Sequence, residues 1–288
     1  MKSPLITGNR TVEDVLRKHL EEQRDAAAKP APRARGNPPP PPPLPGAGTT
    51  AVTSLADYIK LENIVCVDAD GKVFERYDAL YVAKDIIRNP NQSQVSKILY
   101  QWAVYFERAG LFLPSFALSC AVVAALYQQK SNPEIEKVLQ QYKDKGNGDG
   151  YQAQNTIIDY AREEIVHYPL AADVTQSAAV NVSRTRTALS FSKATLQDSL
   201  LADALRDSAS VRYVKQLTGL SDPSVLVDIG TYFGKPAKLW FPWNDQQGSV
   251  QTDKGAAWLG CNRDNFSLDA YVNLYNTYAA RGVRLGAP

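Results

Sequence analysis

Histidine and cysteine, two residue types that often perform chemistry, are scarce in this sequence. Nucleophilic catalysis needs a Ser or Cys held near a His, and the chain offers only His19 and His167. We interpret His167, which precedes Tyr168-Pro169, as a residue at the end of a helix. The three cysteines are far apart, fitting neither a disulfide framework nor a zinc cluster and indicating a reducing compartment. We therefore expect no catalytic residue, bound metal or cofactor.

Two short motifs resemble ligand-binding loops. Asp68, Asp70 and Gly71 look like the start of a calcium loop, but its twelfth position is Ala79 rather than an acid. The apolar runs on either side, over 64–74, instead predict a β-hairpin with its turn at Asp-Ala-Asp-Gly. The glycine-rich segment 146–150 lacks the lysine of a phosphate-binding P-loop, and we interpret it as a flexible loop.

The segment 181–215 is locally basic in a chain whose net charge is only +2. Its portion 183–187 reads SRTRT, which combines guanidinium and hydroxyl donors of the kind that hold phosphates without reading bases. An ordinary solvated helix face is an equally good interpretation. If the segment binds RNA, the expected contacts are Arg184, Arg186, Lys193, Arg206, Arg212 and Lys215.

Aromatic side chains follow the basic segment. Residues 230–266 are dense in Gly, Pro and aromatic residues, which predicts loop-rich structure. We expect these rings mainly to pack a C-terminal subdomain, with base stacking as the alternative. The rings closest to the basic segment are Tyr232, Phe233, Trp240, Phe241 and Trp243.

The first 53 residues predict a disordered arm. Residues 11–28 have the periodicity of a short amphipathic helix, and six consecutive prolines, 38–43, enforce an extended polyproline II linker. Such a run also resembles ligands of SH3, WW or profilin-like partners. Residues 1–10 lack the apolar core of a signal peptide, and no apolar run is long enough to span a membrane, so we expect a soluble cytosolic chain.

Helical spacing of apolar residues dominates the remainder and predicts a mainly α fold with one small β-hairpin. We expect a helical core domain over 54–220 and a loop-rich C-terminal subdomain over 221–288, packed on that core. The helices are expected over 54–62, 77–88, 93–109, 115–129, 134–145, 151–167, 173–207 (with a break near 182–192), 211–218 and 267–281.

The layout as a whole resembles the coat and nucleocapsid proteins of plant and fungal RNA viruses: a disordered arm, a helix-rich core, a basic Arg/Ser/Thr segment and an aromatic C-terminal part. The resemblance implies a non-enzymatic subunit of the virion, made in the host cytoplasm, that self-associates in many copies and packages genomic RNA through its phosphates. The alternative is a cytosolic adaptor that recruits partners with its proline-rich arm. An enzyme of unfamiliar type is a third possibility.

Overall fold

The computed structural model describes residues 54–86, 106, 110–143, 152–167, 187–192, 198–240, 254–272 and 279–286. The chain divides at Gly48 into two units, and all of the described residues belong to the second unit, Thr49–Pro288. The arm expected over 1–53 and the helix expected over 93–109, apart from Phe106, lie outside the described residues.

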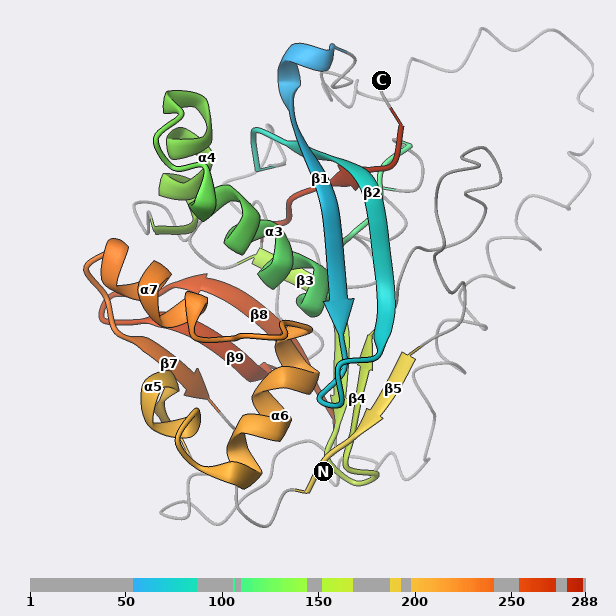
Figure 1. Ribbon diagram of the computed structural model, residues 1–288, viewed down its shortest axis with the longest axis vertical. Helices are drawn as coiled ribbons and strands as arrows, with labels where there is room; N and C mark the ends of the chain where they lie inside the picture. Colours follow the sequence, from blue (N-terminus) through green and yellow to red (C-terminus); the bar gives the residue numbers. More distant parts are fainter. Residues whose placement is uncertain are drawn as a thin grey trace, which may run out of the picture. The chain divides into compact units, whose positions relative to one another are not determined.

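The folded unit is mixed α/β, so the expectation of a mainly α fold is wrong. Its described residues form ten strands and five α-helices (Figure 1). Seven strands make one mixed sheet in the order β5-β4-β3-β8-β9-β7-β6, which joins strands from both sides of residue 220. Among the described strands of this sheet, only β7 and β9 pair in parallel. The strands are β3 (Gln152–Asp159), β4 (Glu164–His167), β5 (Thr187–Ser190), β6 (Ser199–Leu200), β7 (Ala237–Trp240), β8 (Lys254–Cys261) and β9 (Phe266–Val272).

A long hairpin forms most of the second sheet. Strands β1 (Tyr58–Val67) and β2 (Val73–Ala83) pair antiparallel, and the short β10 (Val283–Arg284) extends the sheet beyond β2. The predicted hairpin turn is confirmed. The helices expected over 54–62 and 77–88 are wrong, because only a 3-10 turn, η1 (Leu55–Asp57), precedes β1 and the second range belongs mostly to β2.

The helices expected over 115–129, 134–145 and 211–218 are confirmed, although the last begins at Ser208. The α3 helix (Phe116–Gln128) begins after Ser115, whose hydroxyl accepts a hydrogen bond from the amide of Leu118. The α6 helix (Ser208–Thr218) is capped by Asp207 and ends at Gly219, which has a left-handed φ of 65°. The third confirmed helix is α4 (Pro133–Lys143). The two remaining described α-helices are α5 (Leu201–Ala204) and α7 (Val225–Tyr232).

Several expected helices are strands, since both faces of the central strands β3, β8 and β9 are buried and the polar–apolar alternation of a half-exposed strand is lost there. The range 151–167 forms the antiparallel pair β3–β4, in which Ile157 and Ile158 are buried on opposite faces. The range 267–281 contributes to β9 instead of a last helix, and the described part of 173–207 holds β5, β6 and α5. Residues 230–266, expected to be loop-rich, include the end of α7 and strands β7 and β8.

The helices pack on one face of the large sheet. Helices α3 and α4 contact β8, while α5 and α7 contact β7 (Figure 1). Alternate residues of β8 and β9, such as Leu259 and Leu268, belong to the same hydrophobic cluster as α3, which is buried on almost every side. No described helix is long and apolar enough to cross a membrane.

Candidate nucleic-acid interface

The structure describes half of the predicted RNA-binding residues. Arg206 follows α5, while Arg212 and Lys215 lie three residues apart on α6 and therefore share a helix face. The other three predicted contacts, Arg184, Arg186 and Lys193, lie outside the described residues.

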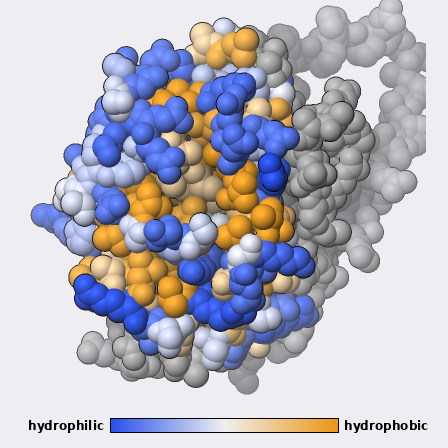
Figure 2. All heavy atoms as spheres, in the orientation of Figure 1, coloured by the Kyte–Doolittle hydropathy of each residue, from blue (hydrophilic) through white to orange (hydrophobic). Residues whose placement is uncertain are grey.

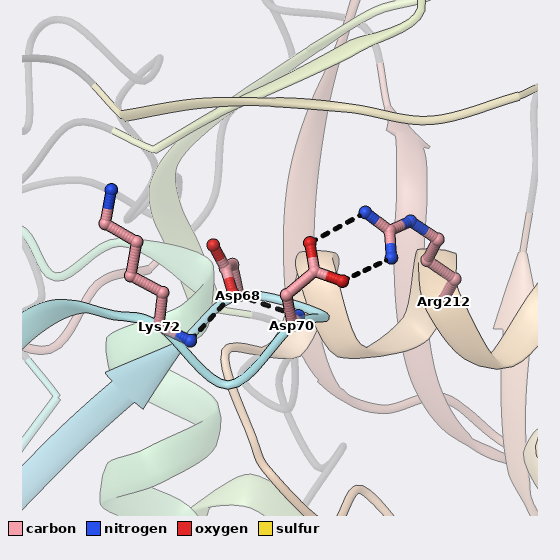
Figure 3. A network of polar contacts seen from close by, with 4 residues as sticks. All are labelled: Asp68, Asp70, Lys72 and Arg212. Atoms are coloured by element: carbon pink, nitrogen blue, oxygen red, sulfur yellow. Dashed lines mark hydrogen bonds and ion pairs between the residues drawn. The ribbon is translucent and has the colours of Figure 1, made fainter.

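Arg212 is held by the turn of the β1–β2 hairpin (Figure 3). Its guanidinium makes a bidentate ion pair with the carboxylate of Asp70, with N–O distances of 2.7 and 2.9 Å. Asp68 shapes this turn, since its carboxylate accepts hydrogen bonds from the amides of Asp70 and Lys72 at 3.0 and 2.9 Å. The arginine lowers the pKa of Asp70 through this hydrogen bonding and its charge. Arg212 thus links the hairpin turn to α6 through a bidentate but solvent-exposed pair, and a phosphate would have to displace Asp70.

Arg206 and Lys215 are less firmly engaged. The side chain of Arg206 is 80% exposed and contacts Asp203 at 3.2 Å, an exposed pair that contributes about 1 kcal/mol or less. Lys215 is half-buried, and its charge helps to lower the pKa of Asp222, after the hydrogen bonds of that carboxylate to Ser224. Acidic residues therefore balance much of the positive charge along the described part of this segment.

The described aromatic residues have different roles. Phe233 is buried and packs edge-to-face against Phe266 in the core, so it cannot stack on a base. Trp240 is half-buried at the end of β7, with the ammonium group of Lys238 3.5 Å from the centre of its ring. Phe241 and Trp243 lie outside the described residues.

Tyr232 belongs to a cluster that the sequence reasoning missed. Its ring meets that of Tyr127 edge-to-face at 5.5 Å, and the ammonium group of Lys130 lies 3.7 Å from the centre of the Tyr127 ring. We call Tyr127, Lys130 and Tyr232 the tyrosine–lysine cluster. The sequence carried no clear signal for it, because Tyr127 lies in the last turn of the expected helix 115–129, Lys130 follows that helix, and Tyr232 is more than 100 residues away.

His167 is a structural residue at the end of a strand, not of a helix. Its Nε2 lies 2.9 Å from the carbonyl oxygen of Gln216, which can only accept, so Nε2 carries the proton. Nδ1 then accepts a hydrogen bond from the hydroxyl of Thr156 at 2.9 Å, and that oxygen accepts one from the amide of Phe116. Burial lowers the pKa of His167 to about 4. The imidazole therefore joins β3, β4, α3 and α6 in its neutral form.

A buried carboxyl group, Glu75, lies under the start of α3. Its oxygens accept hydrogen bonds from the hydroxyl of Tyr77 at 2.6 Å and from that of Ser115 at 3.0 Å. Burial raises the pKa of Glu75 and also that of the neighbouring Cys66 thiol, which stays protonated and is a poor nucleophile. This group of residues ties the hairpin to the N-cap of α3.

A second buried acid, Asp269, lies on the face of the large sheet away from the helices. It stands opposite Trp258 on β8 and beside Trp240 on β7. Its Oδ1 has no hydrogen-bond partner, and burial, followed by the charge of Asp198, raises its pKa to about 7. Asp269 therefore changes charge near neutral pH. The described residues contain no group of three or more His, Cys, Asp or Glu side chains that could hold a metal.

Comparisons with known proteins found no relative of this chain. Neither a family model, nor a curated protein, nor a solved structure matches this chain. Its interpretation therefore depends on the residues described above.

Proposed function

We propose that this chain is the coat or nucleocapsid subunit of an RNA virus, which self-assembles in many copies and packages RNA through non-sequence-specific phosphate contacts. The observation that carries the proposal is the division of the chain at Gly48 into a proline-rich arm and one compact unit. A linked arm has a high local concentration around its own unit and can reach neighbouring copies without rigid geometry.

The edge of the smaller sheet supports self-assembly. Strand β1 spans ten residues, and its described strand neighbour is β2 alone. An edge strand offers backbone donors and acceptors to a segment of another chain. The face drawn in Figure 2 also mixes hydrophobic with hydrophilic side chains, and the large apolar residues most exposed in the described part of the chain are Leu55, Val73 and Leu200.

Exposed cations support the RNA contacts. Because Arg206 loses only a weak, solvent-exposed ion pair when it leaves Asp203, a phosphate can take the place of that carboxylate. Arg184 and Arg186 supply the densest pairing of guanidinium and hydroxyl groups in the sequence. Arg212 contributes less in this proposal, since its guanidinium is already engaged by Asp70.

The proposal is tested by removing these cations. We expect the triple substitution of Arg184, Arg186 and Arg206 by Ala to preserve the fold and to reduce the RNA retained in purified particles. A matched control is Arg76→Ala, which removes an exposed, Asp-paired arginine from β2. Equal RNA retention by the triple variant and the control would contradict the proposed contacts.

A second candidate function, a cytosolic adaptor, is favoured by the six-proline run at 38–43. A polyproline II helix binds aromatic-lined grooves with little loss of conformational entropy. The adaptor predicts a small species without RNA that captures such domains through the arm, and replacing the six prolines by Gly and Ser would abolish the capture. The coat protein instead predicts large particles whose RNA content survives this replacement.

A further inference from the structure

We propose that the tyrosine–lysine cluster is a contact site for single-stranded RNA, at which a base stacks on Tyr127 and Lys130 binds the adjoining phosphate. This inference rests on the proposed function and assigns part of the RNA contact to a surface outside the basic segment 181–215. The cluster joins the end of α3 to α7.

The rings of the cluster are held in place before any ligand binds. The hydroxyl of Tyr232 donates a hydrogen bond to the carboxylate of Glu136 on α4, and that carboxylate also accepts one from the side-chain amide of Gln140 at 2.6 Å. The edge-to-face contact with Tyr232 in turn fixes the Tyr127 ring. A rigid ring loses little conformational entropy on binding, which favours a stacked base.

The lysine over the rings can be displaced. Lys130 is exposed, and its ammonium group is 3.7 Å from the centre of the Tyr127 ring and 5.7 Å from that of Tyr232. An exposed cation–π contact stabilises less than the stacking of a base on an aromatic ring. A base can therefore replace the ammonium group on the face of Tyr127, and the long lysine side chain then reaches the phosphate beside that base.

The charges around the cluster favour an anion. Glu136 is an acid at the cluster, and its hydrogen bonds to Tyr232 and Gln140 lower its pKa, with a smaller contribution from the charge of Lys143. Lys143 therefore lies near enough to Glu136 to act as a second positive charge beside Lys130. Two lysines, Lys130 and Lys143, thus lie beside the carboxylate of Glu136, which suits the path of a nucleic-acid backbone.

The test measures binding of a fluorescent oligouridylate of about sixteen nucleotides to the full chain freed of nucleic acid, as a function of salt. We expect Tyr127→Leu to weaken binding by about 5- to 150-fold, the range found for one stacked base, whereas Tyr127→Phe keeps the ring and the affinity. Lys130→Met should reduce the magnitude of the salt slope by about 0.7, the value for one phosphate of a single strand. Lys137→Met, on the exposed face of α4, is the matched control and should change neither.

The failures of the two proposals are distinguishable. If the wild-type chain binds the oligonucleotide and both Tyr127→Leu and Lys130→Met bind it as the wild type does, the cluster is not an RNA contact and the proposed function is unaffected. If the wild-type chain binds no RNA at any salt concentration, the proposed function itself is wrong. A loss for Tyr127→Leu that is equally large with duplex RNA would exclude base stacking at this site.

Discussion

Gly219 connects α6, α3 and the hairpin, and we predict that Gly219→Ala destabilises the fold by about 2–5 kcal/mol. Its φ of 65° lies in the left-handed region, which costs an alanine about 1–2 kcal/mol. An added Cβ would also lie 2.6 Å from the Cβ of Ala117 and 3.1 Å from that of Cys66. Relieving such an overlap in a packed core costs about 1–3 kcal/mol.

A second glycine separates the two contributions. Gly234 follows α7 with a φ of 69°, yet nothing lies within 4 Å of its ideal Cβ position. Gly234→Ala should therefore cost only the backbone part, about 1–2 kcal/mol. The measurement is urea-induced unfolding of both variants at the same protein concentration, because association would add to the apparent stability. A loss for Gly219→Ala no larger than that for Gly234→Ala would show that Gly219 is not packed against α3.

Three further predictions concern buried groups. Because burial lowers the pKa of His167 to about 4, the unfolded chain binds the extra proton first, and the free energy of unfolding should fall by up to about 3 kcal/mol as pH falls from 6.5 to 4. Urea unfolding of His167→Gln should show a weaker dependence of stability on pH. The same dependence in both proteins would contradict a neutral buried imidazole. The pKa of Asp269 is raised to about 7, so the folded chain binds the extra proton first and the free energy of unfolding falls as pH rises from about 4 through 7. Asp269→Asn should therefore be more stable than the wild type by about 1 kcal/mol or more between pH 6 and 8. Equal stability of the two would argue against burial of the carboxyl group. All three cysteines are buried, so a thiol reagent such as DTNB should label none in the native chain and three per chain in denaturant; rapid native labelling would mean that a cysteine is exposed.

The parts of the fold that the sequence predicted are those set by local signals. The hairpin turn follows from Asp68 and Gly71, because the Asp68 carboxylate bonds two amides of the turn and Gly71 has a positive φ. Helix α3 follows from the proline before it, Pro114, and the end of α6 from Gly219, whereas the cap at Asp207 was missed because that residue was expected to end the preceding helix. These signals act within a few residues, so they can be identified without knowing the tertiary structure.

The errors in the predicted fold come from strands that are buried on both sides and from strands whose alternation is interrupted. In β8, four consecutive residues from Ala256 to Leu259 are buried, so no alternation marks the strand. In the hairpin, Asn63 has a φ of 55° in the middle of β1 and interrupts its alternation. After Leu61 the next buried residue is Ile64, three positions later instead of two. The helix expected over 54–62 ended at this irregularity, so the first half of β1 was not recognised as part of the hairpin. The pairing that decides the structure joins segments far apart in the sequence.

The candidate site could be predicted only in part for a related reason. The basic residues were identifiable from composition, but the pairing of Arg212 with Asp70 joins residues 142 positions apart. The tyrosine–lysine cluster likewise joins α3 to α7, and Glu136 of α4 holds its Tyr232. Contacts of this kind depend on tertiary packing, which local patterns do not specify.

The most direct test of the central claim is size-exclusion chromatography with light scattering and the ratio of absorbance at 260 and 280 nm, before and after nuclease and high salt. The proposal predicts megadalton particles that carry nuclease-protected RNA, with binding that weakens steeply as salt rises because phosphate contacts release counterions. A small species without nucleic acid at every salt concentration would contradict the coat-protein proposal and favour the adaptor.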